Sequence, residues 1–175
     1  MKDVFTVKRS ADSDDVLKQL NGQFFKVMNV SADTELEDVD SGAIICADFS
    51  TDGTDITLPK CAAGLYFKVL VTVTAHADAG CKIKVGNAAD YFFGVYTLID
   101  SDTQNQLDVQ TVIKATAAAA PTDYDNIDLD GNGTAAGGEV GSTLEFIGTD
   151  ENGWFVNAVM YTTGTPASTA AKSAS

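Results

Sequence analysis

The sequence predicts an all-β protein, a jelly-roll-like β-sandwich or barrel. Short runs rich in aromatic and β-branched residues recur at a spacing of roughly 8 to 12 residues, with Gly, Asn and Asp between them. No apolar periodicity of the helical kind continues beyond about three turns. We therefore expect one β domain over residues 23–161, preceded by an arm (1–22) and followed by a small, polar tail (162–175) that has little to bury.

The first half of the domain contains four expected strands, namely 23–30, 43–49, 55–58 and 65–74. The acidic stretch 33–40 is typical of a solvated loop, and Asp52–Gly53 is typical of a hairpin turn. The run 65–74 is the clearest strand, because its alternation puts an apolar set on one face. That set is Leu65, Phe67, Val69, Val71 and Val73.

The second half continues the same rhythm. Its expected strands are 81–85, 91–99, one or two within 103–116, 124–129, 142–148 and 154–161. Four aromatic side chains are assigned to the core, since a buried ring stabilises a fold by a few kcal/mol: Tyr91, Phe146, Trp154 and Phe155. Four glycines are expected in turns with unusual dihedral angles: Gly64, Gly138, Gly141 and Gly153.

Charge and composition exclude several classes of function. The chain has 175 residues, of which 45% are hydrophobic, and a formal net charge of −14. Such a surface repels nucleic-acid phosphates and anionic lipid, so neither nucleic acid nor membrane is an expected partner. No stretch has the apolar length of a secretory signal or a membrane span, which indicates synthesis in a cytosol.

The three cysteines, Cys46, Cys61 and Cys81, lack the spacing of zinc sites and are expected to be reduced thiols. A reducing cytosol disfavours disulfides, although a bond between Cys61 and Cys81 stays open at this point.

Catalytic residues are hard to find. The single histidine, His76, lies between two expected strands, where a solvent-facing turn is the simpler interpretation, and no serine lies in a GxSxG context. Glu145 lies within a strand, but alternation places it on the outer face, opposite to Leu144 and Phe146. We expect no enzymatic activity.

A calcium-like motif stands out near residue 130. Asp128, Asp130, Asn132 and Glu139 occupy positions 1, 3, 5 and 12 of an EF-hand loop, with glycine at position 6. The flanking segments are β-like rather than helical, so the expectation is either a Ca²⁺ site on a β-hairpin or a glycine-rich turn with incidental acidic residues. No other cofactor is indicated.

The arm carries a small basic patch, Lys2, Lys8 and Arg9, which could contact an acidic surface on a partner. Its second half, 10–20, is typical of a short helix, because Ser10 or Ser13 could cap it and acidic residues follow.

A set of turn glycines and core residues within 42–165 resembles a known family. The segments that carry the resemblance are Asp55–Pro59 (DITLP), Ala63–Phe67 (AGLYF), Asn126–Leu129 (NIDL), Thr134, Gly137–Gly138, Gly141, Leu144–Phe146 (LEF), Gly153–Val156 (GWFV) and Gly164–Thr165. They resemble small virion proteins of tailed bacteriophages, among them head decoration (cement) proteins and β-rich modules of phage fibres. The acidic DLDGNG stretch departs from that pattern and keeps a metal ion in question.

The resemblance implies a non-enzymatic virion protein on the outer surface of the capsid. It implies a homotrimer that bridges neighbouring major capsid subunits, so the expected partners are the major capsid protein and further copies of the chain. Two alternatives remain: a head-fibre, tail or spike module that binds host surface glycans, and a Ca²⁺-dependent binding module.

Overall fold

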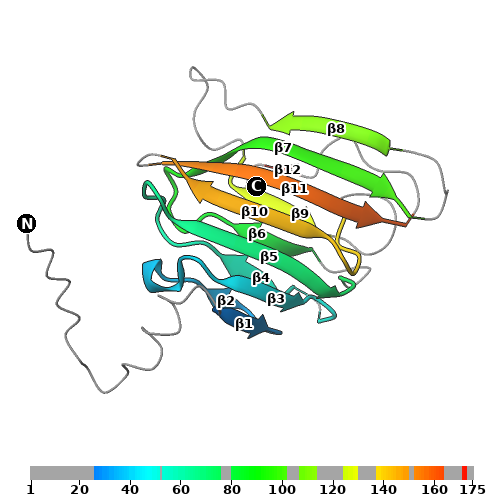
Figure 1. Ribbon diagram of the computed structural model, residues 1–175, viewed down its shortest axis with the longest axis horizontal. Helices are drawn as coiled ribbons and strands as arrows, with labels where there is room; N and C mark the ends of the chain where they lie inside the picture. The colour runs from blue at the N-terminus through cyan, green and yellow to red at the C-terminus, as the bar shows by residue number, and fades with distance from the viewer. Residues whose placement is uncertain are drawn as a thin grey trace, which may run out of the picture.

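The computed structural model describes residues 26–51, 53–75, 80–101, 124–129, 137–149 and 152–163 in full, and the backbone of 107–113 and 171–172. Two mixed β-sheets lie face to face (Figure 1), which confirms the all-β class. The seven-stranded sheet has the order β1-β3-β5-β10-β11-β7-β8, and the five-stranded sheet has the order β12-β9-β6-β4-β2. Their bounds are β1 (Val27–Val30), β2 (Thr34–Glu35), β3 (Ile44–Asp48), β4 (Asp55–Thr57), β5 (Tyr66–Val73), β6 (Cys81–Lys84), β7 (Tyr91–Asp100), β8 (Leu107–Ile113), β9 (Asn126–Leu129), β10 (Thr143–Gly148), β11 (Gly153–Thr162) and β12 (Ala171–Lys172), with a 3₁₀-helix η1 (Asp38–Asp40) after β2.

The chain alternates between the two sheets from β1 to β7. A chain that crosses from one sheet to the other reverses its direction, and it reverses again when it crosses back. It therefore re-enters the first sheet in its original direction. Consecutive strands within each sheet are therefore parallel, as in the pairs β1/β3, β3/β5, β2/β4 and β4/β6. The predicted hairpin at Asp52–Gly53 is wrong for this reason, because β3 and β4 lie in different sheets. The 33–40 stretch likewise contains β2, η1 and the buried Leu36, and is not loop throughout.

The C-terminal part of the domain completes the larger sheet. Strands β10 and β11 form an antiparallel pair that lies between β5 and β7, and β7 pairs with β11 in parallel. Strand β12, from the predicted polar tail, pairs antiparallel with β9 of the same chain.

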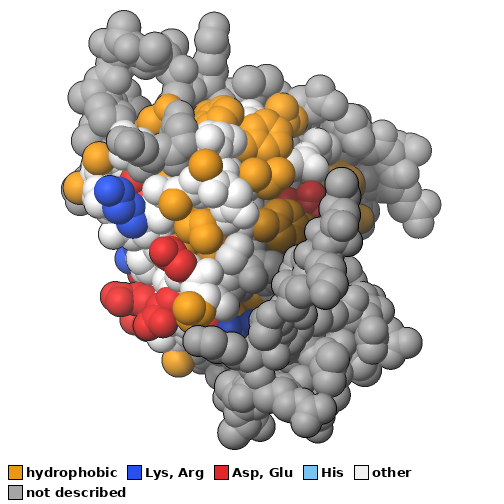
Figure 2. Space-filling model, turned by 60° about the vertical axis from the view of Figure 1, so that its left-hand side comes forward, with side chains coloured by type: hydrophobic (Ala, Val, Ile, Leu, Met, Phe, Trp, Pro, Cys, Tyr) orange, Lys and Arg blue, Asp and Glu red, His pale blue; other side chains and the backbone are white. Residues whose placement is uncertain are grey.

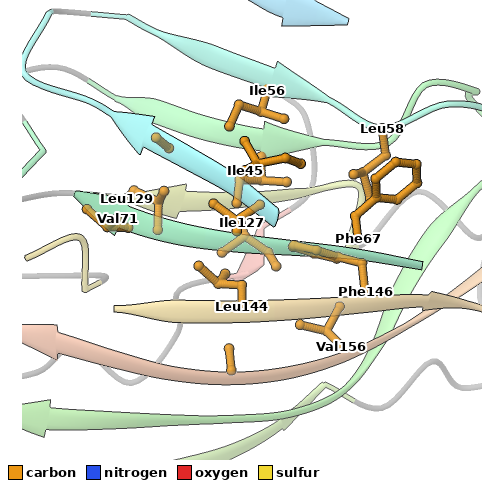
Figure 3. Close-up of a cluster of buried hydrophobic side chains, with 14 of the residues drawn as sticks. Ile45, Ile56, Leu58, Phe67, Val71, Ile127, Leu129, Leu144, Phe146 and Val156 are labelled. Atoms are coloured by element: carbon orange, nitrogen blue, oxygen red, sulfur yellow. The ribbon is translucent and has the colours of Figure 1, made fainter. Parts of the chain in front are cut away.

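The core fills the space between the sheets (Figure 3), with Ile45, Phe67 and Phe146 from the larger sheet facing Ile56 and Ile127 from the smaller one. Aromatic rings tie its strands together: Phe67 lies 5.9 Å from Trp154 and Phe92 lies 5.6 Å from Phe146, centroid to centroid. The alternation predicted in 65–74 is confirmed at Phe67, Val69 and Val71, which are buried, while Val73 at the strand end is 40% exposed.

The cysteines are thiols, and none of the three is in a disulfide bond. Cys81 on β6 directs its Sγ toward the carbonyl oxygens of Phe49 and Thr51, at 3.5 and 3.4 Å. This contact fastens the segment that leaves β3 to the second sheet.

Three of the four predicted turn glycines have positive φ, namely Gly64, Gly138 and Gly141, whereas Gly153 opens β11 with no such angle. Gly94, in the middle of β7, is not among the predicted glycines, although its φ is 137° and a Cβ atom there would lie 2.1 Å from the carbonyl oxygen of Val156. The absent side chain therefore lets β7 approach β11 closely.

Within the described residues, no helix has the length and apolar character needed to cross a membrane.

Candidate interaction surface

Five side chains form an apolar row on the outer face of the seven-stranded sheet: Tyr66, Tyr91, Phe93, Ile147 and Phe155. Four of them are in register on neighbouring strands, because Tyr66 lies opposite Ile147, Ile147 opposite Phe155, and Phe155 opposite Phe93. The Phe93 ring contacts Phe155 edge-on at 5.6 Å and Tyr91 at 6.1 Å. Ile147 is 40% exposed and the aromatic side chains are half-buried, so the row forms a continuous apolar band across four strands.

The row exists because β7 and β11 carry apolar residues at outward-facing as well as inward-facing positions. In β11, Trp154 and Phe155 are neighbours in sequence and must point to opposite faces of the sheet. Trp154 enters the core, as predicted, and Phe155 does not. The assignment of Phe155 and Tyr91 to the core is therefore wrong, although that of Phe146 and Trp154 is confirmed. Consecutive aromatics within one strand were the sequence signal for this outer row.

A polar pair borders the apolar row. Lys68 on β5 and Glu145 on β10 lie opposite each other, and the Lys68 Nζ atom is 3.0 Å from a Glu145 carboxylate oxygen. The Tyr66 hydroxyl lies 3.4 Å from the same oxygen. Burial raises the pKa of the Tyr66 phenol, and the Glu145 charge adds to that shift. The predicted outward orientation of Glu145 is thus confirmed.

Further along the same face, Val95 and Val159 are 36% and 37% exposed. Of the outward-facing side chains on β5, β7, β10 and β11, Lys68 and Glu145 are the charged ones, and their opposite charges form an ion pair. Figure 2 shows the end of the sheet where β5, β7 and β11 begin. Hydrophobic side chains gather in the centre and upper part of that surface, and most of the charged side chains lie to the left of them and below them.

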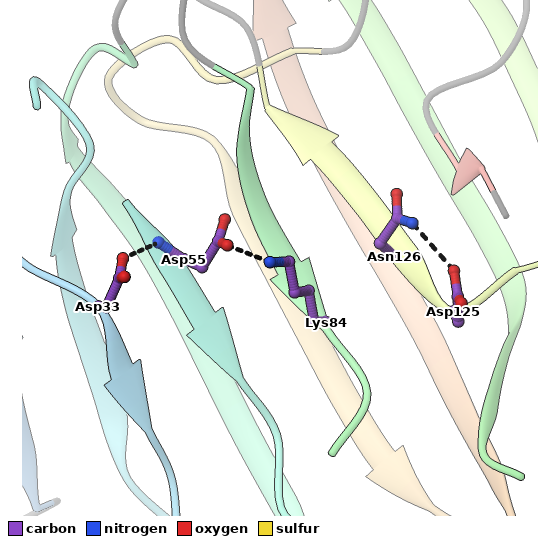
Figure 4. Close-up of polar contacts among 5 residues, drawn as sticks. All are labelled: Asp33, Asp55, Lys84, Asp125 and Asn126. Carbon is purple, nitrogen blue, oxygen red and sulfur yellow. Dashed lines mark hydrogen bonds and ion pairs between the residues drawn. The ribbon is translucent and has the colours of Figure 1, made fainter. Parts of the chain in front are cut away.

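The outer face of the five-stranded sheet is different, because it carries alternating charges. Asp55 on β4 forms an ion pair with Lys84 on β6, and its backbone N–H donates a 2.9 Å hydrogen bond to the Asp33 carboxylate (Figure 4). The strand register places Lys82 between Asp55 and Asp128. This face therefore consists of acidic and basic groups that compensate one another locally.

The predicted calcium ligands are only partly within the described residues. Asp128 lies on β9 opposite Lys82. A Glu139 carboxylate oxygen accepts a 2.6 Å hydrogen bond from the Ser101 hydroxyl, and its backbone N–H donates to the Tyr161 carbonyl at 3.2 Å. Asp130 and Asn132 lie outside the described residues. Among the residues that are described, no three acidic, histidine or cysteine side chains come together as metal ligands, and the calcium site stays a prediction.

Two other predicted features, the basic patch Lys2, Lys8 and Arg9 and the turn histidine His76, also lie outside the described residues. The contact of the arm with an acidic partner therefore stays a prediction.

One buried carboxyl group, that of Asp90, precedes β7. Its side chain is fully buried, and one carboxylate oxygen accepts a 2.6 Å hydrogen bond from the backbone N–H of Cys61. The other oxygen has no hydrogen-bond partner among the described residues. Burial raises the pKa of Asp90, against smaller opposing effects of the Cys61 N–H and the Lys60 charge. This contact holds the segment between β4 and β5 against the start of β7, next to the apolar row.

No protein-family model, curated protein or solved structure matches this chain.

Proposed function

We propose that this chain is a non-enzymatic structural protein of a tailed-bacteriophage virion, one that decorates the capsid and stabilises it by bridging neighbouring major capsid subunits as a homotrimer. It would be made in the bacterial cytoplasm and act on the outer surface of the capsid. The proposal starts from the resemblance of residues 42–165 to head decoration proteins.

The observation that supports it best is the apolar row. A protein that works alone in water gains nothing from a band of aromatic side chains on an outer sheet face, whereas a protein that docks onto other subunits does. The row is built on four hydrogen-bonded strands with a fully packed core beneath it. It is thus a rigid surface, which reduces the entropy lost on association.

The proposal is tested by co-sedimentation of the purified chain with expanded, undecorated capsids. We expect saturable binding at a fixed ratio to the major capsid subunit, and particles that withstand heat better when the chain is bound. A chain that stays in the supernatant at every concentration would contradict the proposal. Repeating the assay with a chelator tests whether binding needs a divalent metal ion, and repeating it with Asp128→Ala tests whether the predicted calcium loop holds that ion.

A second candidate is a fibre, tail or spike module that binds host glycans. The specific observation in its favour is the same row, because Tyr91, Phe93 and Phe155 present aromatic rings of the kind that stack on sugars. It predicts glycan binding by the isolated chain, which Phe93→Ala should weaken. A glycan array with no binding, together with binding to capsids, would reject this candidate.

A further inference from the structure

The net charge of the chain is distributed unevenly. The whole chain carries −14, yet the outward side chains of the four strands that bear the apolar row sum to zero, because Lys68 and Glu145 form an ion pair. We infer that this face is the contact surface for a second copy of the chain, with the apolar row at its centre. The inference rests on the proposed homo-oligomer and assigns a surface to it.

The composition of this face matches that of protein interfaces. The central part of an interface is depleted in charged residues and enriched in Tyr and Phe, with a polar rim around it. Here the row supplies two tyrosines, two phenylalanines and an isoleucine, and Val95 and Val159 extend the apolar area. The Lys68–Glu145 pair lies beside the row and would be covered together with it.

Electrostatics favours this face for a contact between two copies of the chain. Two chains of −14 repel each other, and the repulsion is smallest where the contact surfaces themselves have no net charge. The face with the apolar row meets that condition. The four charges of Asp55, Lys82, Lys84 and Asp128 on the five-stranded sheet also sum to zero, but a contact there would have to desolvate all four, whereas the row offers apolar area to bury. A positively charged partner would instead be drawn to the acidic remainder of the surface.

Within the described strands β5, β7, β10 and β11, burial of the outer face leaves no ionised group without a partner. Lys68 and Glu145 compensate each other within one chain, and the Tyr66 hydroxyl lies next to Glu145. Both charges keep that partner when a second chain covers them, which avoids the large penalty of an unpaired buried charge.

The test compares two exchanges of an exposed aliphatic residue for glutamate. Ile147→Glu puts a charge within the row, where Ile147 is 40% exposed, and Val39→Glu puts the same charge on η1, where Val39 is 78% exposed. Sedimentation equilibrium of the full chain over a broad range of concentration measures self-association. We expect the wild type and Val39→Glu to assemble equally, and Ile147→Glu to assemble at least about tenfold more weakly, as for a residue near the centre of an interface.

Circular dichroism melts of both variants verify that they fold. Should Ile147→Glu fail to fold, Phe93→Ser serves as the second variant within the row. A wild-type chain that is monomeric at all concentrations would overturn the inference, as would equal assembly of a folded row variant and Val39→Glu.

The experiment also separates this inference from the proposed function. A monomeric chain that still co-sediments with capsids, and loses this binding in the row variant, would overturn the second copy as occupant and assign the row to the capsid. A chain that assembles through the row without binding capsids would contradict the decoration proposal alone. If removal of residues 1–22 abolishes assembly while Ile147→Glu does not, the arm replaces the row as the contact and the inference is wrong.

Discussion

The two outer faces of the sandwich differ more than its two inner faces do. Both sheets point buried aliphatic and aromatic side chains into one shared core. Outside, the seven-stranded sheet presents the apolar row, whereas the five-stranded sheet presents Asp55, Lys82, Lys84 and Asp128 in alternating charge. Strand β6, whose Cys81 and Ile83 point into the core, has the alternating pattern of a strand in a sheet with one solvent-exposed face.

Strands β7 and β11 have a different pattern, since neither of their faces is polar throughout. Such strands are typical of sheets covered on both sides. The larger sheet therefore has one more apolar face than the fold itself uses. That extra face is available for an assembly contact.

The largest expected effect comes from two adjacent phenylalanines of β7 that point to opposite faces. Phe92 is fully buried against Phe146, and Phe93 belongs to the apolar row. We expect Phe92→Ala to lower the free energy of unfolding by about 3–5 kcal/mol through cavity formation, and Phe93→Ala to lower it by about 1 kcal/mol or less in the dissociated chain. Urea denaturation at low protein concentration measures both.

The same pair provides its own control, since the two changes delete identical atoms from one strand. An equal loss of stability in both variants, at concentrations where the chain is dissociated, would mean that Phe93 is covered within a single chain. The larger sheet would then have no free outer face at Phe93.

An intermediate effect is expected at Asp90, which holds the start of β7 and hence the end of the row. Its raised pKa means that the folded state favours the neutral carboxyl. The stabilisation is therefore complete below the unfolded-state pKa, near 3.8, and is lost as pH rises through the folded-state pKa. Asp90→Asn, which cannot ionise, should gain stability relative to the wild type over that interval.

Thermal melts of wild type and Asp90→Asn across the acidic pH range measure this difference. Asp40 and Asp48 have lowered pKa values, because hydrogen bonds from Lys26 and Ser50 respectively stabilise their ionised forms. Their contribution therefore changes with the opposite sign, but it is present in both proteins and cancels in the comparison. A difference between the two proteins that does not change with pH would show that the Asp90 carboxyl has the same pKa folded and unfolded.

Strand positions could be predicted from the sequence, but strand partners could not. Alternation located β5, β10 and β11 to within a residue or two, because local patterning decides which residues adopt extended structure. The Asp52–Gly53 turn has the composition of a hairpin and yet joins two sheets, since turn chemistry sets a change of direction and not the partner of the next strand. Parallel pairing depends on contacts far apart in sequence, which no local pattern encodes.

Prediction from sequence is limited in a similar way for single residues of the candidate surface. The sequence-based prediction assigns Phe155 and Tyr91 to the core, because a buried aromatic ring stabilises a fold by a few kcal/mol. The alternation that correctly placed Glu145 outside would also have placed Phe155 outside, because its direct neighbours Trp154 and Val156 are both buried. Where residue type and alternation disagree, alternation was the better guide in this chain, and the disagreement itself marked the outer surface.

The smallest expected effect on stability concerns two ion pairs, one on each outer face. Lys84 with Asp55 lies on the charged face and Lys68 with Glu145 beside the apolar row, and both lysines are about equally exposed, at 41% and 36%. Half-exposed pairs contribute about 0.2–1 kcal/mol, so Lys84→Gln and Lys68→Gln should lower the stability of the dissociated chain by similar, salt-sensitive amounts.

At concentrations where the chain assembles, the two variants should separate. A buried Glu145 that has lost Lys68 would be an unpaired charge in the interface, so Lys68→Gln should weaken self-association while Lys84→Gln leaves it unchanged. Equal self-association of the two variants would mean that both faces remain exposed to solvent in the assembly. The apolar row would then need a contact that leaves its polar border exposed.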